Sequence, residues 1–252
     1  MNDTLTVGSY TLPGIIVLNC NDDDAPEPDY EAIPIPGRSG DLHIWNRRWK
    51  NKMITYHCFC PANARTVVPG VLVELMKTTG YRRITDTLHT DYYKMGEYIG
   101  GTTPVYSDGG ATATFDLTFD CKPQKWLLSG ENEIEITSTS AQSPTHITNP
   151  TGYPVFPLLK ITGYGLCRVI SPSYSVTISS DAGVAITSPN PIIHDCEINR
   201  THSVNGSTSY DQYATVSIAS IWANNPGFTS TRLDAYHAST AALKIVPRWW
   251  KL

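Results

Sequence analysis

The most regular pattern in the chain is an alternation of apolar and polar residues between Ala111 and Cys121. The apolar positions share one face of an extended strand: Ala111, Ala113, Phe115, Leu117, Phe119 and Cys121. The positions between them are polar: Thr112, Thr114, Asp116, Thr118 and Asp120. Because side chains of a strand point alternately to its two faces, this segment predicts a strand with one buried face.

The other elements of the first half are shorter. Residues 14–18 form an apolar run and residues 53–60 alternate, and both predict strands. An apolar stripe at helical spacing is formed by Val68, Leu72, Leu75 and Met76. Pro69 fits a helix only near its first turn, and Gly80 is a residue type at which helices commonly end. We therefore expect one short helix near residues 69–79.

Beyond residue 130 the chain consists of short strand-like segments separated by Pro, Gly, Asn and Ser. Residues 133–137 alternate like a first strand, after a boundary near Ser129-Gly130. Six further segments predict strands: Leu158–Thr162, Tyr174–Ser179, Val184–Thr187, Ile192–Ile198, Ala214–Trp222 and Ala242–Val246. We expect a mainly β protein with one short helix, built from an N-terminal domain of residues 1–129 and a C-terminal β-sandwich of residues 130–252.

The composition favours a folded, loop-rich β protein. Hydrophobic residues make up 40% of the 252 residues and charged residues 17%, which argues against disorder. A net charge of −4 gives no electrostatic support for binding nucleic acid. No apolar run approaches about 18 residues, and the N-terminus lacks the features of a signal peptide, so we expect folding in a cytosol and no membrane segment.

Metal and catalytic motifs are scarce. Cys58 and Cys60 would share one face of a strand, but no second ligand pair accompanies them, so buried, reduced thiols are expected. In His194-Asp195-Cys196-Glu197 the side chains would alternate between faces and not converge on an ion. The run Asp22-Asp23-Asp24 lacks the spacing of a calcium loop and is interpreted as a solvated loop. No catalytic or cofactor-binding motif is present, so we expect no enzyme activity, cofactor or metal.

A basic, aromatic segment lies between residues 45 and 52. Its members are Trp45, Arg47, Arg48, Trp49, Lys50 and Lys52. Such a segment suits single-stranded nucleic acid, a solvated hairpin tip, or a protein interface, where Trp and Arg are enriched. A separate acidic segment contains Asp22, Asp23, Asp24, Glu27, Asp29 and Glu31. If copies of the chain contact one another head to tail, the basic segment of one copy would meet the acidic segment of the next, which makes the two our candidate subunit interface.

Five landmarks follow one another along the chain. They are Pro36-Gly37-Arg38-Ser39-Gly40-Asp41-Leu42, Gly80-Tyr81-Arg82 with Asp86 and Tyr92-Tyr93 after it, Phe119–Gln124, Pro157–Gly165, and Leu243–Trp249. In this order and spacing, the chain resembles the distal tail proteins of siphophages and related prophages over nearly its whole length. It departs from them at Ser39, where many relatives carry an acidic or amide residue, and at Pro69-Gly70, which interrupts the usual helix.

The resemblance implies an N-terminal domain of sheet plus helix that closes into a homo-hexameric ring, and a galectin-like β-sandwich outside the ring. It implies a structural virion protein at the tail tip, a baseplate hub assembled in the host cytoplasm. The implied partners are further copies of the chain, the tail tube protein, the tail-associated baseplate protein and, in some phages, a receptor-binding protein. DNA would pass through the lumen without sequence-specific contacts.

Two other classes of function stay open. Galectin-like sandwiches hold sugars in some proteins, so the alternative is a carbohydrate-binding protein that recognises the host cell wall. The second domain offers only Trp222, Trp249 and Trp250 for stacking on a sugar. A cell-wall hydrolase would need two placed carboxylates or a metal site, and the sequence identifies neither.

Overall fold

The computed structural model describes residues 3–77, 79–170, 174–180, 191–218 and 232–252. The chain divides into two compact units, Met1–Lys125 with Leu252, and Trp126–Lys251. The division precedes the expected boundary near Ser129-Gly130 because residues 127–130 bond to the end of the chain. The Leu127 N–H donates to the Trp249 carbonyl (2.9 Å) and the Arg248 N–H to that of Gly130 (2.8 Å). Within the described residues no helix is long and apolar enough to cross a membrane.

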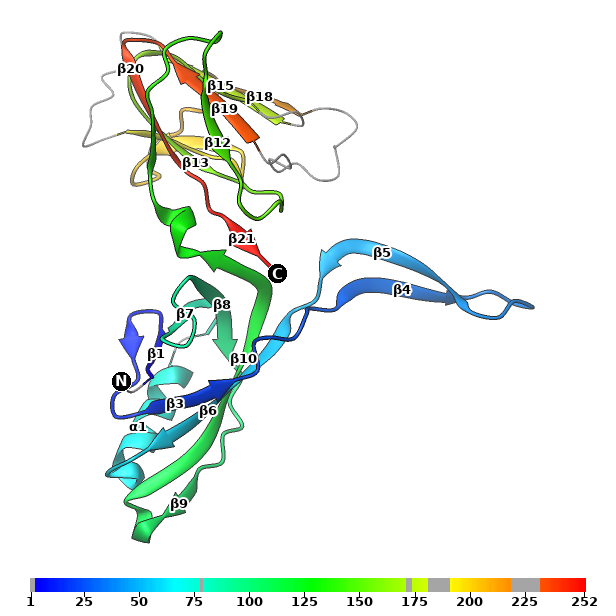
Figure 1. Cartoon of the computed structure of the whole chain (residues 1–252), viewed down its shortest axis with the longest axis vertical. Helices are drawn as coiled ribbons and strands as arrows, with labels where there is room; N and C mark the ends of the chain where they lie inside the picture. Colours follow the sequence, from blue (N-terminus) through cyan, green and yellow to red (C-terminus); the bar gives the residue numbers. More distant parts are fainter. Residues whose placement is uncertain (1–2, 78, 171–173, 181–190, 219–231) are drawn as a thin grey trace. The chain divides into compact units, whose positions relative to one another are not determined.

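One sheet forms the body of the first unit (Figure 1). Its strands run in the order β2 (Tyr10–Thr11), β1 (Leu5–Val7), β7 (Arg82–Asp86), β8 (Tyr92–Tyr98), β10 (Thr112–Leu127), β6 (Lys52–Cys60) and β3 (Ile16–Cys20), with β9 (Val105–Ser107) beside β10. The predicted alternating strand is β10, and its inward residues are buried: Ala113, Phe115, Leu117, Phe119 and Cys121. That prediction is confirmed.

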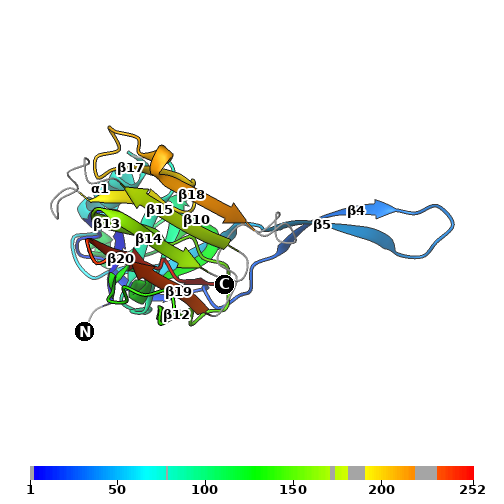
Figure 2. The same cartoon turned by 90° about the horizontal axis from the view of Figure 1, so that it is seen from above.

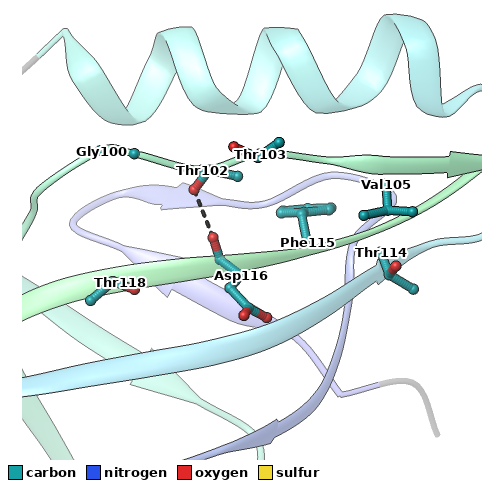
Figure 3. A pocket seen from close by; sticks show the side chains of 9 residues that line it. Gly100, Thr102, Thr103, Val105, Thr114, Phe115, Asp116 and Thr118 are labelled. Atoms are coloured by element: carbon teal, nitrogen blue, oxygen red, sulfur yellow. Dashed lines mark hydrogen bonds between the residues drawn. The ribbon is translucent and has the colours of Figure 1, made fainter.

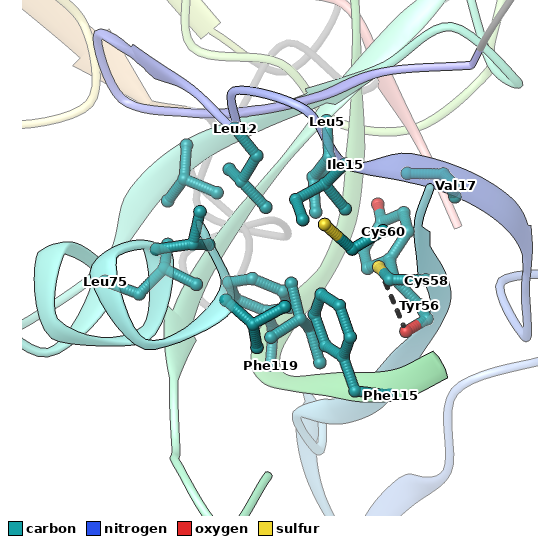
Figure 4. Packing of buried hydrophobic residues seen from close by; sticks show 14 of the residues in the cluster. Leu5, Leu12, Ile15, Val17, Tyr56, Cys58, Cys60, Leu75, Phe115 and Phe119 are labelled. Carbon is teal, nitrogen blue, oxygen red and sulfur yellow. Dashed lines mark hydrogen bonds between the residues drawn. The ribbon is translucent and has the colours of Figure 1, made fainter. Parts of the chain in front are cut away.

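The one α-helix of the described residues, α1 (Ala64–Met76), packs on the buried side of this sheet (Figure 4). It buries Ala64, Val68, Val71 and Leu75. The expected start near residue 69 is wrong by five residues, since Pro69 lies inside the helix. A proline there removes one backbone hydrogen bond, and burial of the apolar stripe offsets that loss.

Two strands of the first unit leave the sheet as a hairpin. They are β4 (Pro28–Pro34) and β5 (Asp41–Trp49), which pair with each other in a two-stranded sheet. Figures 1 and 2 show this hairpin extending away from the sheet of the first unit. We call residues 28–49 the arm.

The second unit is a β-sandwich of two five-stranded sheets. One sheet has the order β11 (Ile134–Ile136), β20 (Ala241–Val246), β13 (Leu158–Gly163), β16 (Ile192–Asp195) and β17 (Arg200–Ser203). The other has the order β12 (Thr145–Thr148), β19 (Arg232–His237), β14 (Gly165–Ile170), β15 (Tyr174–Ser180) and β18 (Ala214–Ile218). Side chains from both sheets share one core, so the expected sandwich is confirmed.

Not every predicted strand has an outcome. The segment Val184–Thr187 and the part of Ala214–Trp222 after residue 218 lie outside the described residues. The segment predicted as Ile192–Ile198 ends at Asp195, where a turn leads into β17.

Candidate protein interface

A tight turn closes the arm at its tip. The Arg38 N–H donates to the Ile35 carbonyl oxygen at 3.2 Å across Pro36-Gly37. Gly37 has a φ of 78°, which suits a type II turn with proline before glycine. The tip therefore lies in the segment Pro36–Gly40, and the interpretation of residues 45–52 as a hairpin tip is wrong.

One face of the arm is aromatic. Tyr30 lies opposite Trp45 in the strand register, and Ala32 lies opposite His43. The rings of Tyr30 and His43 stack with centroids 4.5 Å apart, and Trp45 meets Trp49 edge-on at 6.5 Å. Tyr30 and Trp45 nevertheless remain 46% and 53% exposed.

The opposite face is aliphatic. Ile33 lies opposite Leu42, and Glu31 lies opposite Ile44. Ile33, Leu42 and Ile44 are 36%, 49% and 45% exposed. A two-stranded hairpin is only marginally stable in water, and contiguous exposed apolar surface is typical of interaction sites. An arm with apolar residues on both faces is therefore suited to contact another protein.

The candidate basic and acidic segments meet within one chain. Arg48 Nε lies 2.5 Å from Asp29 Oδ2, and Lys50 Nζ lies 3.5 Å from Glu27 Oε2. The hydrogen bond from Arg48 lowers the pKa of the Asp29 carboxyl. The chain thus satisfies these charges itself, one pair within its own arm and the other at the base of the arm.

Two of the candidate residues do not belong to the surface. The Asp22 side chain is fully buried, and that of Lys52 is only 10% exposed. The interpretation of Asp22-Asp23-Asp24 as a solvated loop is therefore wrong at Asp22. Lys52 Nζ lies 3.4 Å from Asp22 Oδ1 and donates to the carbonyl oxygens of Asp22 and Asp24, each at 2.6 Å.

Asp22 belongs to a buried polar network at the root of the arm. Its Oδ2 accepts a hydrogen bond from the Tyr92 hydroxyl at 2.6 Å and lies 2.9 Å from Lys94 Nζ. Lys94 is 2% exposed and also contacts Asp86 Oδ2 at 3.0 Å. Asp86 accepts a hydrogen bond from the Tyr56 hydroxyl at 2.8 Å. One buried ammonium therefore bridges two buried carboxylates.

Electrostatics keep these three groups charged. Burial alone raises the pKa of the Asp22 carboxyl, but Lys94 and the Tyr92 hydrogen bond outweigh it and lower that pKa. The pKa of the Asp86 carboxyl is lowered in the same way, because Lys94 and the Tyr56 hydrogen bond outweigh burial. Burial lowers the pKa of Lys94, yet Asp86 and Asp22 together raise it above its ordinary value. The network is therefore ionic at neutral pH.

Lys94 was not among the residues predicted from the sequence, although its position in β8 carries a signal. In β8, Tyr92, Lys94 and Gly96 occupy alternate, inward positions. A lysine at an inward position of a strand requires a buried partner, which the sequence pattern alone does not name.

A hollow of about 470 Å³ lies between residues 100–105 and β10 (Figure 3). Thr102 donates from Oγ1 to the Asp116 carbonyl oxygen at 2.6 Å, and the Asp116 carboxylate lies 2.6 Å from His57 Nδ1. Thr102, Asp116 and His57 therefore form hydrogen bonds with one another. Across the described residues, no group of three or more His, Cys, Asp and Glu side chains is arranged to hold a metal.

The other sequence candidates have structural partners. Cys58 and Cys60 are buried in the core of the first unit. His194 and Cys196 are buried, and His194 Nδ1 lies 2.9 Å from Thr201 Oγ1. Asp195 binds Arg248 through both carboxylate oxygens, at 2.8 and 2.9 Å. Burial alternates over residues 194–197 as expected, but Cys196 and Glu197 lie in the turn after β16 and not in a strand.

Comparison with known proteins identifies a shared fold. No protein-family model matches the sequence, and the curated proteins give no match either. Among solved structures, the SPP1 Dit protein, described as a paradigm of the hub adsorption apparatus in phages that infect Gram-positive bacteria, is similar at a TM-score of 0.67 with 11% identity. The alignment covers 100% of this chain and 99% of that one. Two structures of the phage P2 baseplate in its activated conformation are also similar. The one with Ca has a TM-score of 0.48 at 8% identity, and the alignment covers 100% of this chain and 99% of that one. The one with Sr has a TM-score of 0.46 at 9% identity, with 96% and 97% covered.

Proposed function

We propose that this chain is a structural protein of a phage tail tip, a ring-forming hub that joins the tail tube to the baseplate or adhesion apparatus. The observation that carries the proposal is the fold shared with the SPP1 Dit hub protein along the whole of both chains. A match covering both units is more specific than a match to a sandwich alone, because β-sandwiches serve many unrelated functions.

The arm supports the assembly of several copies. It presents apolar side chains on two faces, and a heterologous contact with the next copy would cover them and close a ring. In this contact Trp45 and Trp49 are the anchors, because large aromatic residues contribute most at interfaces. Arg47, Arg48 and Lys50 flank them and fix orientation more than affinity.

The proposed partners follow from the hub role. One face of a homo-hexameric ring would bind the tail tube protein and the other the tail-associated baseplate protein, with a receptor-binding protein at the periphery. The ring lumen would let DNA pass during ejection. The protein would assemble in the host cytoplasm and remain in the virion at the tail tip.

Native mass spectrometry and negative-stain electron microscopy of the purified chain test the ring. We expect assemblies of about six times the 27.8 kDa chain mass, with a central hole, and a shift to smaller species for Trp45→Ala and Trp49→Ala. Charge reversal at Arg47 should weaken assembly less than either tryptophan change. A chain that stays monomeric at high concentration and with co-expressed tail proteins would contradict the proposal. Specific micromolar binding on a cell-wall glycan array would instead favour a carbohydrate-binding protein.

A further inference from the structure

Three lysines from three different strands converge on Asp22. Lys52 begins β6, Lys94 lies in β8, and Lys125 lies near the end of β10 as the last residue of the first unit before Trp126. Lys52 and Lys125 each approach Asp22 Oδ1 to 3.4 Å, and both donate to the Asp22 main-chain oxygen, at 2.6 and 2.8 Å. Lys94 occupies the other carboxylate oxygen at 2.9 Å.

Asp22 lies where the regular strand ladder is interrupted. The pairing of β3 with β6 ends at Cys20 opposite Tyr56, and the pairing of β4 with β5 begins at Pro28 opposite Trp49. From Lys52 onward the returning chain pairs with β10, beginning at Lys52 opposite Cys121. The outgoing leg (residues 21–27) and the returning leg (residues 50–51) are joined by other bonds. They include Lys50 N–H to the Glu27 carbonyl at 2.8 Å, and Lys52 Nζ to the Asp22 and Asp24 carbonyls.

An interrupted ladder is where a hairpin bends, since regular cross-strand hydrogen bonds no longer fix its two legs. Here the side chain of Lys52 replaces the missing ladder on one leg. Lys125 binds Asp22 as well, and so joins the root of the arm to β10. A buried ion network is a costly way to gain stability, because apolar residues of similar volume often stabilise as well or better. Its hydrogen bonds instead impose one geometry.

We propose that the Asp22–Lys52–Lys94–Lys125 network is a joint that fixes the direction of the arm and couples it to the end of β10 at Lys125. When all three lysines are bound, the arm leaves the sheet in one direction and reaches its contact with little ordering cost. Loss of the Lys125 bonds loosens the arm root while the core of the first unit stays folded. The value of a fixed arm rests on the proposed ring, but the joint itself is a property of the single chain.

Hydrogen exchange of the full chain, at concentrations where it is monomeric, tests the joint. The variants are Lys125→Met and Lys52→Met, and the matched control is Lys122→Met on the same strand as Lys125. Lys122 is exposed and lies over the Tyr81 ring at 5.3 Å, away from Asp22. The reporters are the backbone amides of residues 21–27 and 50–51, which precede the pairing of β6 with β10.

Both joint variants should exchange at least about tenfold faster at these amides, because each loses hydrogen bonds from a charged donor. The amides of the β10 core should be unchanged, and Lys122→Met should match the wild-type chain at every amide. Unchanged exchange at the arm root in Lys125→Met would overturn the coupling. An equal rise over the whole sheet would show that the network only stabilises the fold. If the joint variants behave as expected but no ring forms in the wild-type chain, the proposed function fails and the joint stands.

Discussion

Lys94 Nζ lies 2.9 Å from the Asp22 carboxylate and 3.0 Å from that of Asp86, and none of the three side chains is more than 2% exposed. A cation in this position cannot be lost without leaving two buried anions. The ion pairs on the arm differ, because removal of one partner there leaves the other charge in contact with water.

Replacement of Lys94 by methionine should therefore be severely destabilising. We expect Lys94→Met to lower the free energy of unfolding by about 3–5 kcal/mol, the usual effect of removing one partner from a buried ion pair. The measurement is urea denaturation of the full chain. Lys77→Met is the control, since Lys77 is 60% exposed where it pairs with Glu74, and it should leave the unfolding midpoint unchanged.

His194 should make the second unit sensitive to mild acid. Its side chain is buried, and burial lowers its pKa from 6.5 to about 4. Between these two values the unfolded chain binds a proton that the folded chain excludes, so stability falls as the pH falls from about 6.5 towards 4. From pH 7.5 to pH 5 this residue alone should cost about 2 kcal/mol.

Comparison with His194→Gln isolates this effect from that of the carboxylates. The stability difference between the two proteins, measured by denaturation at several pH values, should change by that amount across the interval. If the curves of stability against pH ran parallel for wild type and variant, His194 would have the same pKa in the folded and the unfolded chain.

Much of the fold could be predicted because long alternation has few interpretations. Strand β10 follows an apolar–polar pattern over more than ten residues, and no helix accommodates it. Strand β17 was not predicted, because Arg200–Ser203 contains no apolar residue. Strand β19 was not predicted either, since its buried positions are Leu233, Ala235 and His237, of which only one is strongly apolar.

The site was harder to predict because its chemistry depends on distant residues. Asp22 lies in an acidic run that resembles a solvated loop, and its partners Tyr92, Lys94 and Lys125 follow 70 or more residues later. The charges of the arm were recognised as two segments of opposite sign. That they pair within one hairpin depends on strand register, which a turn at Pro36-Gly37 sets.

The thiols should be reduced and mostly unreactive in the folded protein. All six cysteines lie in the described residues as reduced thiols, and burial raises the pKa of Cys58, Cys121 and Cys167 to about 12. A thiol reagent attacks the thiolate, so these three should not react at pH 8 in the native chain. After denaturation without reductant, titration should find all six, and a count of four or fewer would require disulfides.

The second unit should fold alone, and the segment before Gly130 should make it more stable. A fragment of residues 126–252 retains the bond from Leu127 to Trp249, whereas a fragment of residues 130–252 loses it. We expect both to unfold cooperatively on heating, with the shorter one less stable by about 1–3 kcal/mol from the lost hydrogen bond and apolar contact. Equal stability would show that residues 126–129 contribute nothing to the unit.

Charge exchange on the arm should distinguish a pair within the chain from a pair between copies. Arg48 and Asp29 lie on opposite legs of one arm, 2.5 Å apart, so Arg48→Glu places two acids side by side and should raise the concentration needed for assembly severalfold. The double variant Asp29→Arg with Arg48→Glu restores an opposite pair inside the arm. If the pair acts only within the chain, the double variant should assemble like the wild type in native mass measurements at low salt. If Arg48 instead pairs with an acid of the next copy, the double variant should assemble no better than Arg48→Glu. The effects of Asp29→Arg alone and Arg48→Glu alone on the free energy of assembly should then be additive in a double-mutant cycle.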